Sequence, residues 1–330
     1  MSKTTDSKHS TVPGFVLVTL LSILLLTHHN GLAQTYSKGQ HIEPAYEGWE
    51  QNADGSYNFI FGYHNENWEE ELHIPVGENN FFSPGAADQG QPTYFLPRRN
   101  RFTFKVQVPA DWGDKELIWT INSPNGVSRK AYATLARDYV VDSVVIASET
   151  GSLGAGTSTP ESRANTPPQV TVLDDNTAGE SIRYAKVGEP LMLRAHVEDD
   201  GLPRPGRAGS GAGITRAEQA RTRESEIKRM LEPPTRVTVG KVNGLFLSWN
   251  VYRGNGNSAH FDPPQIKPWE DTRAAANSPW SALWLPPPIP DDNMYETTVT
   301  FDEPGTYVLW ARADDGGLYH DQYVTVIVSE

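Results

Sequence analysis

The chain has 330 residues, 41 of them acidic and 28 basic, which gives a formal net charge of −13 at neutral pH. An acidic surface repels phosphate backbones, so the sequence predicts no nucleic-acid partner. The chain contains no cysteine, which excludes a disulfide framework and leaves stability to packed cores. Its length is sufficient for two domains of ordinary size.

Residues 1–33 have the pattern of an export signal. Lys3 and Lys8 give a positive start, residues 15–26 are almost wholly apolar, and Gly31-Leu32-Ala33 offers small residues for cleavage. The apolar run is shorter than the roughly 20 residues that a membrane-spanning helix needs. We therefore expect cleavage after Ala33 and a periplasmic or secreted protein that is not an integral membrane protein. The alternative is that this segment is retained as a membrane anchor.

Residues 34–148 predict a first β-sandwich domain. Alternating apolar side chains, separated by Gly, Pro and Asn turns, indicate short strands. The strands expected from this alternation include 57–63, 102–108, 117–121 and 139–147. Residues 149–168 begin rich in Gly, Ser and Thr and have almost nothing to bury, so we interpret them as a flexible linker.

Residues 169–330 predict a second β-sandwich. Between Thr297 and Asp315, apolar and polar residues alternate on both sides of the turn-forming Asp302-Glu303-Pro304-Gly305. This period of two is typical of a pair of antiparallel strands, and 322–328 supplies a closing strand. The fold class predicted for the whole chain is therefore all-β, with two antiparallel sandwiches.

Several motifs follow one another in this second half. Residues 187–201 have the sequence VGEPLMLRAHVEDDG. Residues 247–251 include Trp249, and residues 303–309 place Tyr307 after an acidic turn that contains glycine. In this order they resemble the PKD and immunoglobulin-like β-sandwich domains. The resemblance implies that Trp249 packs at the centre of the core and that the Tyr307 hydroxyl bonds back to the corner backbone. It implies nothing about activity, because this architecture carries many functions.

Two segments depart from a plain sandwich. Residues from about 205 to 233 predict a helical insert, which starts at the capping box Thr215 to Glu218 and mixes basic with acidic side chains as a solvated helix does. The Pro-rich loop 263–290 holds three tryptophans. Their rings either stack on sugars or fill a partner's pocket, or they cap the end of the sandwich. The candidate ligand-binding residues are Trp269, Trp280 and Trp284.

Two Asp-Asp-Gly turns carry the candidate metal ligands. Asp199 and Asp200 follow one predicted strand, and Asp314 and Asp315 follow another. In immunoglobulin-like topology the loops after these strands emerge at the same end, and calcium favours such clusters of oxygen ligands. The alternative is that each Asp-Gly pair only makes a turn. Calcium is the one cofactor that the sequence suggests.

Catalytic signatures are absent from the sequence: it has no phosphate-binding loop, no nucleophile elbow and no zinc-type histidine spacing. We therefore predict an exported, non-catalytic binding or structural module that acts through sandwich-end loops on a protein or polysaccharide of the cell envelope. One alternative is a carbohydrate-binding protein that uses Trp and Tyr stacking. Another is an enzyme of the glycoside-hydrolase type, which would need two carboxylates facing each other across a cleft.

Overall fold

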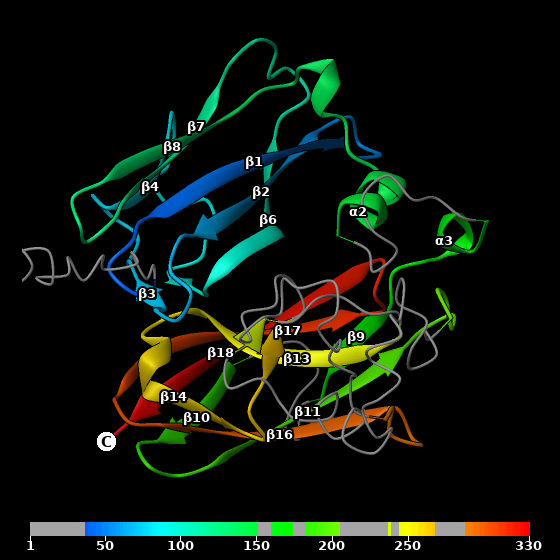
Figure 1. Cartoon of the computed structure of the whole chain (residues 1–330). Coiled ribbons are helices and arrows are strands. Elements are labelled where there is room, and N and C mark those ends of the chain that lie inside the picture. The colour runs from blue at the N-terminus through cyan, green and yellow to red at the C-terminus, as the bar shows by residue number, and fades with distance from the viewer. Residues whose placement is uncertain (1–36, 151–159, 174–181, 205–236, 239–243, 268–287) are drawn as a thin grey trace, which may run out of the picture. The chain divides into compact units, whose positions relative to one another are not determined.

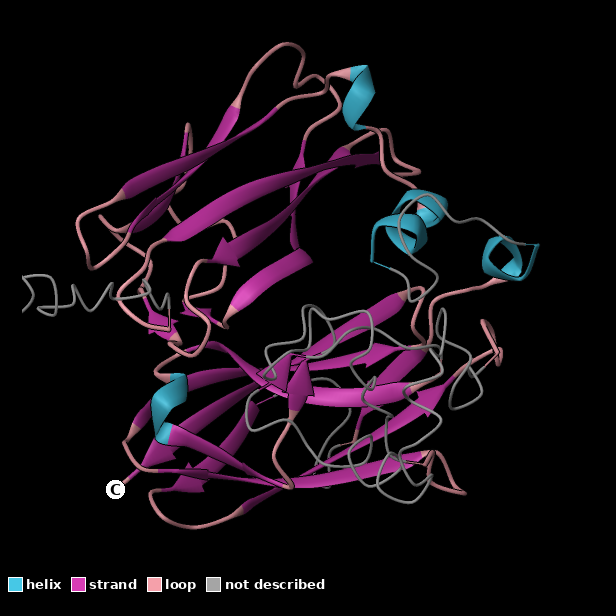
Figure 2. Ribbon diagram, viewed as in Figure 1, coloured by secondary structure: helices cyan, strands magenta, loops and turns pink. Residues whose placement is uncertain are grey.

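Antiparallel sheets dominate the chain, as the alternating sequence pattern predicts (Figures 1 and 2). The computed structural model describes residues 37–150, 160–173, 182–204, 237–238, 244–267 and 288–330. The predicted export signal (1–33) and the predicted helical insert (205–233) lie outside these residues. Within the described residues, none of the helices has the length and apolar character needed to cross a membrane.

The first sandwich has two three-stranded sheets that face each other. One contains β1 (Ile42–Gln51), β2 (Tyr57–Asn65) and β6 (Arg98–Val108). The other contains β4 (Asn80–Ser83), β7 (Leu117–Asn122) and β8 (Ser128–Ala133). A small additional pair is formed by β3 (Leu72–His73) and β5 (Tyr94–Phe95).

Aromatic side chains from both sheets fill this first core. Phe61 on β2 stacks on Phe104 of β6, with ring centroids 5.4 Å apart. Trp119 on β7 is fully buried and meets the Phe104 ring edge-on at 5.0 Å. Because side chains alternate across a strand, Phe59 and Phe61 of β2 reach the same interior face as Phe104 of β6, whereas Phe102 packs with Ile60 in a separate cluster.

The strand predicted over 139–147 is wrong. The structure has a short helical turn η1 (Arg137–Tyr139) and then the helix α2 (Ser143–Thr150). Asp142 precedes this helix and its Oδ1 accepts a hydrogen bond from the Val145 N–H at 2.9 Å. An aspartate at this position satisfies a free N–H of the first turn, which stabilises helix over strand. A further short helix, α3 (Pro160–Ala164), lies within the predicted linker.

The second sandwich has two four-stranded sheets. One has the order β10 (Ile182–Lys186), β18 (Tyr319–Ser329), β17 (Gly305–Asp314) and β13 (Phe246–Arg253). The other has the order β14 (Ala259–Asp262), β16 (Met294–Phe301), β11 (Leu191–Glu198) and β9 (Gln169–Val172). Near them lie the 3-10 turn η3 (Gly256–Ser258) and the short parallel pair of β12 (Val237–Thr238) with β15 (Ile266–Lys267).

This strand order is that of an immunoglobulin-like sandwich. In chain order the seven main strands are β9, β11, β13, β14, β16, β17 and β18. The first, second, fifth and fourth of these share one sheet, and the third, sixth and seventh share the other. The edge strand β10 pairs in parallel with β18, while the other neighbours in these two sheets are antiparallel. The immunoglobulin-like prediction is therefore confirmed, and the narrower PKD assignment stays a prediction.

The tyrosine corner forms as the resemblance implies. The Tyr307 hydroxyl donates a hydrogen bond to the Glu303 carbonyl at 3.0 Å. Tyr307, Leu309 and Trp249 are buried in the same core. Gly254 lies against the Tyr307 ring with a φ of +105°, and an added Cβ would come within 2.8 Å of that ring. Only glycine fits this approach without strain.

Side chains cross between the two sandwiches. Tyr94 and Leu96 from the first half pack into the second core, while Tyr252 and Trp310 from the second half pack into the first. Residues 37–330 accordingly form one compact unit. The domain boundary that we place at the linker stays a prediction.

A buried arginine also joins the two halves. Arg312 on β17 donates Nε–H and Nη2–H to the two oxygens of Asp321 on β18, each at 2.7 Å. Its Nη2 also donates to the Phe102 carbonyl of β6 at 2.9 Å. The guanidinium lies 3.9 Å from the centre of the Tyr319 ring. A bidentate, charge-assisted pair of this kind fixes both partners in orientation.

Candidate functional site

The sequence-predicted residues fall into two groups. Trp269, Trp280 and Trp284 lie outside the described residues. The four aspartates of the two Asp-Asp-Gly turns are described, and the structure brings the two turns to the same end of the sandwich.

Two consecutive residues before β9 hold these turns together. Thr166 donates its N–H and its hydroxyl to Asp200 Oδ2, at 2.9 Å and 2.7 Å. Asn165 donates its Nδ2–H to Asp315 Oδ2 at 3.0 Å. The chain that enters the second sandwich therefore contacts both turns, and we call Asn165 and Thr166 the clasp.

The carboxylates of both turns bond to nearby backbone. Asp199 and Asp314 each accept the N–H two residues ahead, from Gly201 at 2.9 Å and Gly316 at 2.8 Å. Asp315 Oδ1 accepts two N–H groups, from Gly317 at 2.6 Å and Leu318 at 2.7 Å. These bonds are the ones that aspartate makes in tight turns.

Asp315 lies in a buried, acidic environment at this end of the sandwich. Burial raises the pKa of Asp315 to about 7, and the neighbouring Asp314 adds to the rise, although hydrogen bonds to the carboxylate lower it in part. Among the described residues, no three or more His, Asp or Glu side chains are grouped so that they could hold a metal ion. The calcium site stays a prediction.

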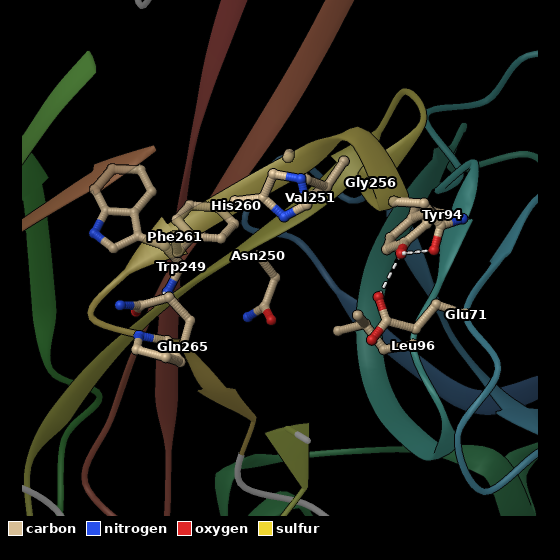
Figure 3. A pocket seen from close by; sticks show the side chains of 13 residues that line it. Glu71, Tyr94, Leu96, Trp249, Asn250, Val251, Gly256, His260, Phe261 and Gln265 are labelled. Carbon is tan, nitrogen blue, oxygen red and sulfur yellow. Dashed lines mark hydrogen bonds between the residues drawn. The ribbon is translucent and has the colours of Figure 1, made fainter. Parts of the chain in front are cut away.

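A pocket of about 350 Å³ opens at another place, beside β13 and β14. Its lining combines aromatic rings, amide side chains and a carboxylate (Figure 3). A volume of this size is at the lower end of the range of small-ligand pockets. The residues that form its walls are Glu71, Tyr94, Leu96, Trp249, Asn250, Val251, Gly256, Asn257, Ala259, His260, Phe261, Pro264 and Gln265.

Sheet topology explains why the protein is open here. Within the described chain, β13 and β14 are edge strands of the two facing sheets. Gln265 connects these sheets, because its Oε1 accepts the Trp249 N–H of β13 at 2.9 Å and its Nε2 lies 3.3 Å from Thr297 Oγ1 of β16. The pocket therefore lies along an open side of the sandwich and has a fixed polar bridge in its wall.

The first sandwich supplies the opposite wall. Tyr94 of β5 donates its hydroxyl to the carboxylate of Glu71, and the same hydroxyl lies 3.2 Å from Asn257 Oδ1 (Figure 3). Gly256 lies directly on the Tyr94 ring, where an added Cβ would come within 2.3 Å of it. This contact fixes the Tyr94 ring and, through it, the orientation of Glu71.

Asn250 is the feature that makes this pocket a candidate site. Only 5% of Asn250 is exposed, and its side chain forms part of the pocket wall. Figure 3 shows the side chain between Gln265 on one wall and Glu71 on the other. Asn250 therefore presents both a donor and an acceptor to whatever fills the pocket.

Charge in the described lining comes from two residues. Glu71 is the single carboxylate, so the described residues do not form in this pocket the facing pair that glycoside hydrolysis requires. His260 is exposed and pairs through Nε2 with Asp302 Oδ2 at 2.6 Å. None of the described lining residues is Lys or Arg.

Sequence reasoning missed this pocket. Asn250 is next to Trp249 in an apolar strand, and a polar residue within such a run was the available signal. Glu71 and Tyr94 belong to the other sandwich, so no local pattern connects them with Asn250. Their proximity follows only from the packing of the two halves.

No model of a protein family matches the chain, and no curated protein matches it either. Solved structures with β-sandwich domains do match, but weakly. The D00–D0 domain of intimin is 10% identical, with 87% of this chain and all of that chain covered and a TM-score of 0.22. The fibronectin(III)-like modules of Clostridium thermocellum CbhA are 9% identical, with 82% and 85% covered and a TM-score of 0.20.

A pair of tandem immunoglobulin domains of titin is 8% identical, with 88% of this chain and 96% of that chain covered and a TM-score of 0.20. Scores this low carry no argument about function. The immunoglobulin-like assignment of the second half therefore depends on its own strand order.

Proposed function

We propose that the protein is an exported, non-catalytic binding module that holds its ligand in the pocket between β13, β14 and Tyr94. One observation carries the proposal: Asn250 is almost fully buried, and its amide side chain lines a cavity large enough for part of a ligand. An amide in the wall of a cavity offers a ligand both a hydrogen-bond donor and an acceptor, and a few polar groups of this kind are typical of small-ligand sites. The export pattern of residues 1–33 supports a place in the periplasm or outside the cell.

The proposal has a signature that a purely structural residue would not give. In Asn250→Leu the side chain keeps a similar size but loses its polar atoms. We expect the free energy of unfolding to change by less than about 1.5 kcal/mol, because the substitution keeps a similar side-chain volume. We expect retention on the ligand fraction to be lost in the same variant.

The experiment uses the chain from Gln34 onward, passed over immobilised polysaccharides and immobilised proteins from the cell envelope. Wild type should be retained on one of these two fractions and Asn250→Leu on neither. The matched control is Tyr184→Ser, because Tyr184 is exposed on β10, away from the pocket lining. Equal retention of wild type and Asn250→Leu would show that the pocket is not the binding site.

The alternative is carbohydrate binding by stacking on Trp269, Trp280 and Trp284. Tryptophan rings on a loop suit the flat faces of sugars. Its test is a pull-down on insoluble polysaccharides with Trp280→Ala and Trp284→Ala. Loss of retention in these variants, with Asn250→Leu behaving as wild type, would favour the loop over the pocket.

A further inference from the structure

We infer that the ligand of this pocket is an extended, uncharged peptide segment that pairs with the edge of β13 and presents an amide to Asn250. The inference depends on the proposed function, because it names the ligand class of the same site. It follows from three properties of the pocket: the direction of the β13 backbone groups, the burial of the aromatic rings and the charge of the lining.

The backbone of β13 is oriented for an added strand. The Trp249 N–H bonds to the Gln265 side chain, so it points away from the neighbouring strand β17. In an antiparallel strand the N–H and C=O of one residue point to the same side, and the pattern repeats every second residue. In β13 this holds up to Val251, because the register shifts between Val251 and Arg253 and leaves the Tyr252 carbonyl facing the edge. The Trp249 carbonyl and the Val251 N–H therefore also point away from β17. The Trp249 N–H is already taken by Gln265, so the Trp249 carbonyl and the Val251 N–H are the groups offered to a peptide added to this sheet edge.

A second segment already uses this edge nearby. The Thr93 N–H, just before β5, donates to the Tyr252 carbonyl of β13 at 3.0 Å, and the Thr93 hydroxyl accepts the Gly254 N–H at 3.0 Å. One end of the β13 edge is thus occupied by extended chain from the first sandwich. A bound peptide would continue this pairing along the pocket, toward Trp249.

Trp249 and Tyr94, the two largest rings of the pocket, do not suit sugar stacking, and of the lining rings Phe261 is only partly buried. Trp249 is 2% exposed and Tyr94 is 3% exposed, so their ring faces are covered by protein. A sugar needs an open ring face for stacking, whereas a peptide needs backbone groups and an amide partner. Asn250 can make two hydrogen bonds to one amide group, as its side chain carries a donor and an acceptor.

The charge of the lining disfavours an anionic ligand. Glu71 contributes a carboxylate with an orientation fixed by Tyr94, and none of the described lining residues is Lys or Arg. The whole chain has a net charge of −13. His260, the basic residue of the described lining, already pairs with Asp302. A carboxylate entering this pocket would therefore meet the like charge of Glu71, which lowers affinity.

The test uses labelled heptapeptides with capped ends, a Thr and Val background and either Gln or Glu at the central position. Binding to the chain from Gln34 onward is followed by fluorescence anisotropy. We expect the Gln peptide to bind about tenfold more tightly than its isosteric Glu partner. Asn250→Leu should weaken the Gln peptide by about tenfold or more, the loss expected for a buried amide contact.

The thermal midpoint of each variant is measured as a control for correct folding. The isosteric Asn250→Asp serves as a second variant. It keeps the volume but adds a negative charge and removes the amide donor, so it should also lose the Gln peptide. The exposed control Tyr184→Ser should bind as wild type.

Three results would overturn the inference. They are the absence of binding by any peptide, equal binding of the Gln and Glu peptides, and binding that does not change in Asn250→Leu. A panel of soluble polysaccharides, run in the same assay, distinguishes failure of the peptide ligand class from failure of the pocket as the binding site. Polysaccharide binding that depends on Asn250 would keep the pocket as the site and refute the peptide class. Polysaccharide binding that is unchanged in Asn250→Leu would contradict the proposed function itself.

Discussion

At the scale of single residues, Arg312 has the largest structural role. Its side chain is 1% exposed, and its hydrogen bonds reach Asp321 in its own sheet and Phe102 in the other sandwich. Removing one partner of a buried pair leaves the other charge unsatisfied, which is more damaging than losing the attraction itself.

We predict that Arg312→Met lowers the free energy of unfolding by about 3–5 kcal/mol, because Asp321 then loses its partner. Urea denaturation followed by fluorescence measures this change. The matched control is Lys105→Met, because Lys105 pairs with Glu50 at 2.6 Å at a more exposed position. That variant should lose no more than about 1 kcal/mol. Equal losses in the two variants would mean that Arg312 is not a buried anchor.

At the scale of elements, the turn after β17 is sensitive to pH. Burial raises the pKa of Asp315 to about 7, above its unfolded value, with Asp314 contributing. The folded state therefore binds more protons than the unfolded state between about pH 4 and pH 7. This group's contribution to stability falls as pH rises through that window and is constant above it.

We predict that Asp315→Asn flattens this pH dependence and raises stability at pH 8 relative to wild type, by an amount that reaches about 4 kcal/mol at most. The Asn165 amide can turn so that its Oδ1, which has no partner in the present arrangement, accepts the new N–H. Urea denaturation between pH 4 and pH 8 gives the difference curve. A wild-type curve parallel to that of the variant would contradict a raised pKa.

The same turns decide the calcium prediction. If Asp199, Asp200, Asp314 and Asp315 bind calcium, added calcium should raise the melting temperature above that in EDTA, because a ligand that binds only the folded state stabilises it. Asp199→Asn should abolish the rise. An unchanged melting temperature in wild type would leave the four aspartates with their role in the turns.

At the scale of the whole molecule, each sandwich completes the core of the other. Tyr94 and Leu96 fill the second core, and Tyr252 and Trp310 fill the first. Separating the halves would expose large aromatic side chains on both, and buried area of this kind is the main source of stability.

We therefore predict a single cooperative unfolding transition for the chain from Gln34 onward. Calorimetry tests it by comparing the calorimetric with the van't Hoff enthalpy. Two separated transitions would show that the halves fold independently and that the crossing side chains contribute little.

The export prediction also belongs to this scale. The mass of the protein recovered from outside the cytoplasm should match a chain that starts at Gln34, since the small residues up to Ala33 suit signal cleavage. A mass that includes residues 1–33 would instead favour the retained anchor.

The sequence by itself determined the β class and the strands around Tyr307, because these depend on alternation and on turn residues close together in the chain. The tyrosine corner and the central place of Trp249 were implied by the resemblance to immunoglobulin-like domains. Sequence reasoning misassigned 139–147, where apolar residues suit strand and helix alike and the capping aspartate decides between them. The pocket was decided only by the tertiary structure. Glu71, Tyr94 and Asn250 are distant in sequence, and they meet because side chains of each sandwich pack into the core of the other.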